Sequence, residues 1–454
     1  MTTNGRALDG FVPASSPFST RTAFKSLSAV SRAVLPNTPQ SLWDQDTARL
    51  PSAHAALRRR AREFADRVIA PIALELDVTP QPPCGEMHPL MRDVFVKASK
   101  EGFQSDLAFP PPLGTASVRG DRYPVLSIAV KVEEFARACG GLMLNLMVPA
   151  LGQSPILISG DANAYRRFLI PAYREMKAGV PHPFSFLITE PTAGSDVEEG
   201  HGASVYTPGM VAKRVPGGWS LSGRKRFIGA GDLSKTISVF AALEGEGMES
   251  WTLFVINPPV PGYRTIRKEL KLGMRASGTA EVELTDVFVP DSNIVGGLRN
   301  GWALNRASLN FSRIPVASMS VGFARGALEA ALEFAGRTTL GGKALVNYQE
   351  IELMLAQMVA ETSAIRSMVW EQARVFIPRQ GAASMTKLHC TDRALEVCNM
   401  AMDLLGNHSL LHPNKVEKAW RDARLPIIFE GTNQINRLAV IEDMQEEVLS
   451  KCTP

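Results

Sequence analysis

The chain lacks the signals of several common classes of protein. Its five cysteines are scattered along 454 residues without a Cys-x-x-Cys pair, so we expect neither a disulfide framework nor a structural zinc site. The most apolar stretch, 142–158, is interrupted by Pro149 and Pro155, so we expect no transmembrane segment. The N-terminus lacks a charged segment followed by an apolar block and a cleavage site, which argues against secretion and favours the cytoplasm.

A surplus of charge and most ligand-binding motifs are also missing. Lys and Arg, 49 together, exceed the 45 acidic residues by only four, which argues against nucleic acid as the main partner. No Gly-x-Gly-x-x-Gly follows a strand pattern and no Gly-x-Ser-x-Gly is present, so Rossmann and serine hydrolase sites have no support. His408 and His412 have metal-ligand spacing, but Pro413 follows directly and no glutamate completes a zincin pattern. We therefore predict no metal site.

What is present divides the chain into four parts. Residues 1–43 are rich in Ser, Thr, Pro and Ala and predict a flexible arm. Because this arm is also rich in Arg and poor in acids, it resembles an organellar transit peptide, and the mitochondrial matrix stays open as an alternative location. Helical spacing fills 44–180, β-rich runs fill 181–295, and long helical segments fill 296–454. The predicted fold class is α+β, with a helical domain, a β domain and a C-terminal domain like a four-helix bundle.

Individual elements can also be predicted. The arginine run 58–60 lies on a helical stretch, and we interpret it as a solvated helix face rather than a phosphate site. The stretch 349–376 has helical spacing without Gly or Pro, which is typical of a bundle or an oligomer core. The predicted strands are 184–189, 219–222, 236–242, 251–256 and 280–289.

Two segments of the β domain have residues suited to ligand binding. Segment 188–196 reads Ile-Thr-Glu-Pro-Thr-Ala-Gly-Ser-Asp and predicts a strand that enters a tight turn. Its small residues and hydroxyl groups can approach a pyrophosphate or a heterocycle, although an ordinary capped turn explains the pattern equally well. Segment 222–231 places Phe227 near two glycines, so its ring can face a planar cofactor. A core phenylalanine is the simpler interpretation of that residue.

A third segment contains a glutamate in apolar surroundings. Glu430 follows the apolar run 425–429 and precedes Gly431. Burial would raise the pKa of this carboxyl group and make it a general base near neutral pH. Gly431 would leave a backbone amide open to a developing oxyanion. A glutamate that opens the next helix, near Thr432, is an equally good interpretation.

In this order, and flanked by this helix–sheet–helix pattern, the three segments resemble the acyl-CoA dehydrogenase family from about residue 45 to 447. The specific motifs are Thr-Glu-Pro-x-Ala-Gly-Ser-Asp at 189–196, Arg-Asp-Ala-Arg at 421–424 and Phe-Glu-Gly-Thr at 429–432. Segments 271–279 and 287–290 support the match. The resemblance implies FAD as cofactor, an acyl-CoA substrate, an electron-transferring flavoprotein as electron acceptor, and a homodimer or homotetramer.

The resemblance also assigns roles to individual residues. Those expected at the flavin or beside it are Phe186, Ile188, Thr189, Ser195, Phe227, Gly229, Thr432 and Gln434. Those expected at the adenosine end are Arg337 and Gln349, from a neighbouring subunit, and Asp403, Gly406 and Asn407. The substrate side is expected to contain Ser195, Arg313 and Gly431.

Glu430 corresponds to the catalytic base of most family members. A minority carry the base just before Arg313, where this chain has Ser312, which cannot act as a base unaided. The implied reaction is α,β-dehydrogenation of an acyl thioester, in which Glu430 removes the α-proton and the β-hydride moves to the flavin.

The chain departs from the family pattern at several places. Gly229 replaces a Ser or Thr beside the flavin and Phe227 replaces the commoner Trp. Segments 340–342, 407–409 and 109–123 differ from the usual Phe-Gly, glycine-rich turn and Tyr-Gly-Gly. Two alternatives therefore stay open. One is a flavin enzyme of the same fold that acts on a carrier-protein thioester, or as an oxidase or monooxygenase. The other is a non-catalytic acyl-CoA-binding or scaffold homologue.

Overall fold

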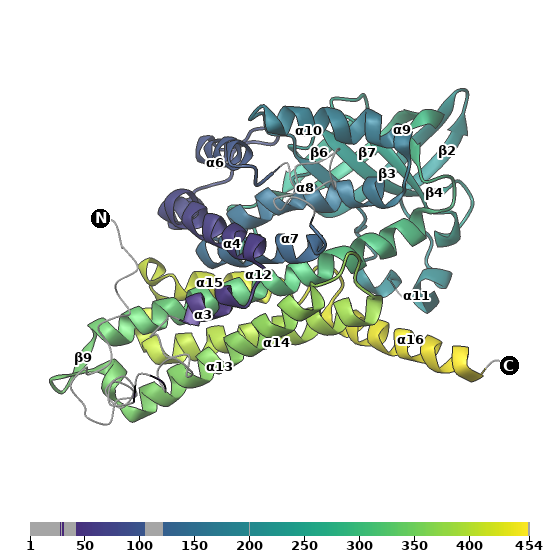
Figure 1. The fold of residues 1–454 in the computed structure, drawn as a ribbon. Coiled ribbons are helices and arrows are strands. Elements are labelled where there is room, and N and C mark those ends of the chain that lie inside the picture. Colours follow the sequence, from purple (N-terminus) through teal and green to yellow (C-terminus); the bar gives the residue numbers. More distant parts are fainter. Residues whose placement is uncertain (1–27, 29, 31–41, 105–120, 199, 453–454) are drawn as a thin grey trace.

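The computed structural model describes residues 28, 30, 42–104, 121–198 and 200–452. The predicted arm at 1–43 and the loop at 109–123 lie almost entirely outside the described residues. Helices, a sheet and long helices follow one another along the chain (Figure 1), which confirms the predicted α+β architecture. The change from helix to strand falls between Lys177 and Phe184. The predicted domain limits at 180 and 295 stay predictions.

The N-terminal helices pack their apolar faces on one another and on the C-terminal bundle. They are α3 (Leu42–Ala48), α4 (Ser52–Phe64), α5 (Ala73–Val78), α6 (Pro89–Lys100), α7 (Pro124–Ala138), α8 (Gly140–Ile158) and α10 (Ile170–Lys177). In the described part of the chain, α8 is the one helix long and apolar enough to cross a membrane by length and composition, and it continues through Pro149 and Pro155. Most of this helix, 71% of the stretch, is buried against α7, α12 and β1, as expected of a core helix.

A mixed sheet forms the middle domain. Its strands are β1 (Phe184–Leu187), β2 (Val211–Val215), β3 (Gly218–Gly229), β4 (Thr236–Leu243), β5 (Thr252–Ile256), β6 (Tyr263–Lys268), β7 (Thr279–Pro290) and β8 (Ile294–Val295). The order is β6-β7-β3-β2-β4-β5-β8, and β1 pairs in parallel with β4. All five predicted strands are present, but β2, β6 and β8 were not predicted. Charged residues interrupt the apolar pattern of β2 and β6, and β8 has only two residues.

The C-terminal domain is built on three long helices. They are α12 (Gly301–Arg337), α13 (Gln349–Gln372) and α14 (Gln380–Leu405), followed by α15 (Val416–Arg424) and α16 (Asn433–Cys452). Helices α12, α13 and α14 lie side by side, and α16 packs on α14 and then extends beyond the bundle (Figure 1). Helix α13 ends four residues before the predicted position, where the chain turns towards Pro378.

The interpretation of the arginine run as a solvated face is wrong for Arg58. Arg59 and Arg60 are exposed, but the Arg58 side chain is 0% exposed. Its Nε donates to Glu134 Oε1 at 2.9 Å and its Nη2 donates to Glu133 Oε1 at 3.0 Å. Because two carboxylates on α7 neutralise this guanidinium, it can be buried between the helices.

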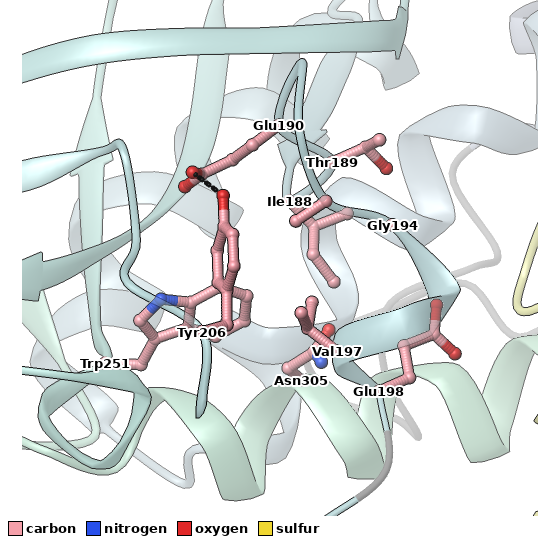
Figure 2. Close-up of a pocket in the computed structure, with 10 residues that line it drawn as sticks. Ile188, Thr189, Glu190, Gly194, Val197, Glu198, Tyr206, Trp251 and Asn305 are labelled. Carbon is pink, nitrogen blue, oxygen red and sulfur yellow. Dashed lines mark hydrogen bonds between the residues drawn. The ribbon is translucent and has the colours of Figure 1, made fainter. Parts of the chain in front are cut away.

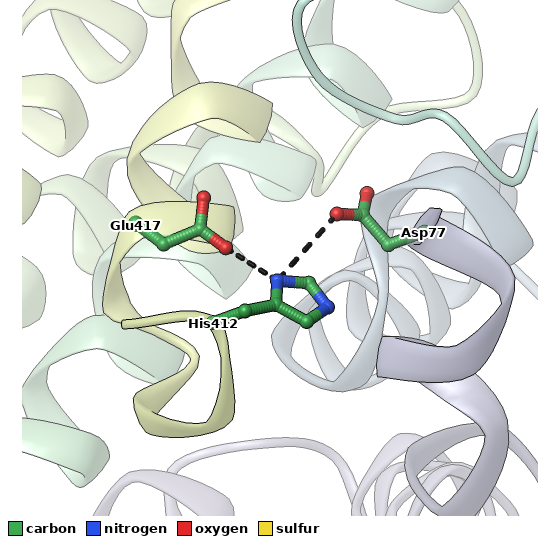
Figure 3. Close-up of side chains that lie close together, drawn as sticks. All are labelled: Asp77, His412 and Glu417. Atoms are coloured by element: carbon green, nitrogen blue, oxygen red, sulfur yellow. Dashed lines mark hydrogen bonds and ion pairs between the residues drawn. The ribbon is translucent and has the colours of Figure 1, made fainter. Parts of the chain in front are cut away.

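A smaller polar cluster joins the N-terminal and C-terminal helices (Figure 3). His412 Nδ1 lies 2.5 Å from Glu417 Oε1 and 3.9 Å from Asp77 Oδ2. These three groups have the chemistry of metal ligands and lie close together. Arg421, from the Arg-Asp-Ala-Arg motif, pairs with both carboxylates, at 2.6 Å from Asp77 and 2.6 Å from Glu417. The guanidinium already supplies the positive charge, so the cluster acts as a contact between domains.

Candidate active site

The three segments predicted to bind ligand or supply the base, 188–196, 222–231 and the one containing Glu430, are in contact. Ser195 Oγ, in the turn after β1, accepts a hydrogen bond from the Thr432 amide at 2.9 Å. In the same turn, the Thr189 carbonyl accepts from the Arg226 amide at 2.8 Å. The turn therefore connects the Glu430 loop with the end of β3, and one continuous surface contains residues from both domains.

Glu430 lies in a tight turn between α15 and α16. Its φ is 57°, in the left-handed region that a non-glycine residue rarely adopts. Ser312 Oγ, on α12, donates a hydrogen bond of 2.5 Å to Glu430 Oε2. Helix α16 begins at Asn433, and the Glu430 side chain bonds to a different helix. The geometry therefore differs from that of a helix-opening glutamate.

The surroundings of Glu430 make it basic. Burial and the nearby Glu198 carboxylate raise its pKa to about 7, against the opposing effects of the Ser312 hydrogen bond, Arg313 and Lys387. A carboxyl group with this pKa is partly ionised at neutral pH and binds a proton much more strongly than an exposed glutamate. The turn thus presents a group suited to accept a proton from carbon.

The next residue, Gly431, must be a glycine. Its φ is 77°, and a Cβ there would lie 2.8 Å from both Glu198 Oε2 and Ile435 Cγ2. Within the described residues, neither the Glu430 nor the Gly431 amide donates a hydrogen bond. These two donors stay available for an oxyanion.

Lys387 holds this loop in place from α14. Its side chain is 0% exposed, and its Nζ donates to the Gly431 carbonyl at 2.6 Å and to Asn433 Oδ1 at 2.9 Å. Burial, together with Arg313, lowers the pKa of Lys387 to about 7. The sequence analysis missed this residue. A signal was present, because Lys387 shares a helical face with Ala383, Cys390 and Ala394, which are all buried.

Arg313 lies on α12, and its charge acts on Glu430. Its Nη1 donates to Ser384 Oγ at 2.9 Å and to Asn310 Oδ1 at 3.2 Å. Its Nη2 lies 3.7 Å from Glu198 Oε2, too far for a good hydrogen bond. Glu198 lies two residues after the end of the predicted turn, and no sequence signal singled it out.

Phe227 stands on the surface beside this turn. Its ring is 58% exposed, so the interpretation as a core phenylalanine is wrong. Its positive φ of 59° interrupts the pairing of β3 with β7 and turns the ring out of the sheet. An exposed ring next to the Thr189 strand suits a planar partner such as an isoalloxazine. Gly229 lies at the end of β3, where its carbonyl accepts from Ser185 Oγ at 2.8 Å.

The other residues predicted near the flavin lie on either side of this surface. Phe186 is buried inside β1, whereas Ile188 is half-buried at its end. Thr432 is half-buried and Gln434 is exposed at the start of α16.

The residues predicted at the adenosine end are not brought to Glu430. All five are exposed at the far end of the bundle: Arg337, Gln349, Asp403, Gly406 and Asn407. Ser312 and Arg337 lie on the same helix, and at about 1.5 Å per residue roughly 37 Å separate them. Within one chain the predicted site residues therefore form two separate groups.

A small cavity lies under the turn after β1 (Figure 2). It is lined by Ile188, Thr189, Glu190, Ala193, Gly194, Val197, Glu198, Tyr206, Trp251 and Asn305. Its volume of about 20 Å³ has room for about one water molecule. On one side, Glu190 accepts from Tyr206 Oη at 2.7 Å and pairs with Lys225 at 2.9 Å. Glu190 of the Thr-Glu-Pro motif therefore has a structural role in the turn.

A second cavity lies between α12 and α16. It is lined by Glu198, Asn305, Arg306, Leu309, Asn310, Arg313, Ile435, Ala439 and Glu442. Glu198 and Asn305 line both cavities. Glu198 is therefore the acidic residue that the two cavities share.

The fold and this site define a class of three-domain flavoprotein oxidoreductase. Models of the acyl-CoA dehydrogenase N-terminal, middle and C-terminal domains match residues 51–175, 185–287 and 299–445. The chain is 30% identical to cyclohexane-1-carbonyl-CoA dehydrogenase of Geobacter metallireducens, over 85% of this chain and 96% of that protein. It is 28% identical to the CarC subunit of the caffeyl-CoA reductase–Etf complex of Acetobacterium woodii, over 85% and 96%.

Solved structures agree with these matches. Butyryl-CoA dehydrogenase from Megasphaera elsdenii superposes with a TM-score of 0.77 at 26% identity, over 87% of this chain and 99% of that one. The chain belongs to the acyl-CoA dehydrogenase family. It is accordingly an FAD-dependent oxidoreductase, and the resemblance found from the three motifs is confirmed.

The residues present fit this cofactor. The exposed Phe227 ring offers a flat apolar contact, and the half-buried Thr189 next to it offers a hydroxyl group. Because an exposed aromatic ring beside a strand end is costly to leave in water, a bound isoalloxazine would cover it.

Proposed function

We propose that this protein oxidises an acyl-CoA thioester between its α and β carbons, with Glu430 as the base that removes the α-proton. The observation that carries the proposal is the Glu430 carboxyl group itself. It is half-buried, its pKa is raised to about 7, and Ser312 orients it from another helix. A kinked turn, a buried lysine and a required glycine hold the loop that carries this side chain.

Each neighbouring residue has a part in the proposed reaction. FAD, when bound, supplies the acceptor for the β-hydride. Glu430 takes the α-proton, and the free amides at Glu430 and Gly431 stabilise the charge that develops on the thioester oxygen. Lys387 fixes the Gly431 carbonyl, so the amides and the carboxylate keep their relative positions. The fixed geometry lowers the entropic cost of bringing base and substrate together.

The test is a Glu430→Gln variant of the FAD-loaded protein. Flavin reduction by a responsive acyl-CoA is monitored under anaerobic conditions as the loss of yellow absorbance. We expect its rate to fall by about 10²–10⁴-fold or more. The matched control is Glu244→Gln, an equal change at an exposed glutamate of the β domain. Undiminished reduction in Glu430→Gln would show that another group is the base.

The class of acyl group needs a direct screen. Relatives are named for cyclic, aryl and short-chain acyl-CoA substrates, so the screen includes cyclohexanecarbonyl, arylacryl and butyryl thioesters, each as CoA and as carrier-protein conjugates. Rapid oxygen consumption during turnover would instead indicate an oxidase. Purification without flavin, and no uptake on reconstitution, would indicate a non-catalytic homologue.

We also propose an electron-transferring flavoprotein as the electron acceptor. Support comes from the relative named as part of a complex with such a flavoprotein. The substrate-reduced protein should reduce a purified electron-transferring flavoprotein faster than it reduces oxygen. The reverse order of rates would overturn this part of the proposal.

The protein is further proposed to act as a homo-oligomer. Of the adenosine-end residues, Arg337 lies roughly 37 Å from Ser312 in one chain, so a second chain must supply it if it contacts the same FAD. Leu438, Ile441, Met444 and Val448 form an exposed apolar stripe on α16, where it extends from the bundle. Such a stripe suits a subunit contact. Light scattering should show a dimer or tetramer, and Ile441→Glu should dissociate it; a monomeric parent protein would exclude the proposal.

A further inference from the structure

The segment after Ser195 brings a second carboxyl group to the base. A Cβ on Gly431 would lie 2.8 Å from Glu198 Oε2, so this carboxylate rests against the residue that follows Glu430. The same Oε2 atom is buried and has no hydrogen-bond partner within the described residues. In Figure 2, Glu198 lies across the cavity from the Glu190–Tyr206 pair and is separate from it.

One buried guanidinium, that of Arg313, acts on both carboxyl groups. The Arg313 side chain is 6% exposed, and its good hydrogen bonds go to the neutral Ser384 and Asn310. Its separation from Glu198 Oε2 is 3.7 Å, and its charge also acts on Glu430. Arg313 therefore neutralises neither carboxylate fully, and each competes with the other for its charge.

Other charged groups surround Glu198 and Glu430. Burial raises the pKa of Glu198, while Arg313, Lys387 and Arg306 oppose this effect. The groups that face the two carboxyl groups are Ser312, Arg313 and Arg306 on α12, Lys387 on α14, and Asp196 in the turn itself. Helix α16 contributes Glu442 to the neighbouring cavity, where it pairs with Arg306 at 2.6 Å.

Resting on the proposed role of Glu430, we propose that Glu198 is a positioning residue for the base. Its carboxylate shares Arg313 with Glu430 and thereby sets the pH range over which Glu430 can accept a proton. Without Glu198, Arg313 would interact with Glu430 alone, and the repulsion between the two carboxylates would vanish. Glu430 would then ionise at lower pH and be a weaker base when ionised.

The direct test compares Glu198→Gln with the parent protein, both loaded with FAD. The rate of flavin reduction is measured from about pH 5 to pH 9. We expect the acidic limb of the profile to move to lower pH by about one unit, and the maximum rate to fall because the base is weaker. Glu244→Gln is the matched control. It removes one negative charge from an exposed position of the β domain, and its acidic limb should stay in place.

A second readout is independent of turnover. Infrared difference spectroscopy identifies the carboxyl stretch of Glu430 as the band that is absent from Glu430→Gln. In Glu198→Gln this band should titrate at lower pH than in the parent. An unchanged titration, in a variant with normal circular dichroism and FAD content, would overturn the inference even if Glu430 is the base. Conversely, full activity of Glu430→Gln would overturn the proposed function and leave the titration result valid.

If Glu198→Gln does not fold, Glu198→Ser provides the same test. The smaller side chain removes the charge, relieves the contact at Gly431 and leaves a hydroxyl group for the buried site. The same acidic shift supports the inference, and its absence contradicts it.

Discussion

Two groups of buried charges in this molecule contain the same residue types but behave in opposite ways. One lies between the N-terminal helices and the bundle, where Glu133 and Glu134 meet Arg58, Arg325 and Arg366. Its contacts are short, for example 2.8 Å from Arg325 to Glu134 and 2.8 Å from Arg366 to Glu133. The other surrounds the active site, where the Arg313–Glu198 separation is 3.7 Å.

The difference appears in the pKa directions. Burial raises the pKa of every one of these carboxyl groups. In the helical cluster the guanidinium groups outweigh burial, so the pKa values of Glu133 and Glu134 are lowered. In the active site burial prevails, so the pKa values of Glu430 and Glu198 are raised. Close ion pairs with several guanidinium groups give a structural carboxylate, and a single distant guanidinium leaves a reactive one.

The largest expected effect comes from breaking the close ion pairs of the helical cluster. Glu134→Gln would leave Arg58 and Arg325 without a full countercharge in the core, at a cost of about 3–5 kcal/mol. The urea midpoint of unfolding should fall sharply. Glu430→Gln, in contrast, removes a poorly solvated carboxyl group and should leave the midpoint unchanged or raise it. Equal destabilisation by both variants would contradict the comparison.

The same contrast explains what the sequence could predict. The order of domains, the turn at 189–196 and the position of Glu430 follow from local patterns, because each is encoded within a few neighbouring residues. Arg58 was misplaced because its partners, Glu133 and Glu134, come from a helix some 75 residues later. Glu198 and Lys387 were missed for the same reason, because their roles depend on which helices pack around Gly431. Phe227 was misjudged locally because only the register with β7 turns its ring outward.

A second prediction concerns how stability depends on pH. Acid should reduce the stabilisation from the helical cluster, and higher pH should reduce the stabilisation from the active-site carboxyl group. Glu329 pairs with the helical cluster, and its pKa is lowered to about 2 by Arg137, Arg325 and Arg62 against the opposing effect of burial. Its stabilisation is present above its unfolded pKa, near 4.5, and is lost as the pH falls through the folded value. The parent protein should therefore lose stability between about pH 4.5 and pH 2.

Glu430 affects stability in the opposite direction. Its pKa is raised in the folded protein, so its contribution to the free energy of unfolding is fully present below the unfolded pKa of 4.5 and is lost as the pH rises through about 7. The unfolding midpoint of Glu430→Gln relative to the parent should therefore increase from pH 5 to pH 8. A constant difference across that range would show that Glu430 is not perturbed by burial.

A smaller effect is expected from Lys387→Met. The variant removes a cation that lowers the pKa of Glu430 and releases the Gly431 carbonyl. The acidic limb of the flavin-reduction profile should move to higher pH by about half to one unit, opposite to the shift expected for Glu198→Gln. Lys387→Arg keeps the charge and is the control. Its acidic limb should stay near that of the parent even if the altered geometry reduces the maximum rate.

The smallest effect on the maximum rate should come from Ser312→Ala. This change deletes one hydrogen bond to Glu430 Oε2 and leaves Arg313, Lys387 and Glu198 in place. Because the bond favours the charged form, its loss should raise the pKa of Glu430 by about half to one unit and reduce flavin reduction a few-fold below pH 7. At high pH, where Glu430 is fully ionised in both proteins, the rates should converge. A constant loss at every pH would mean that Ser312 orients the carboxylate without affecting its protonation, and the active-site charges would then be set by Arg313, Lys387 and Glu198 alone.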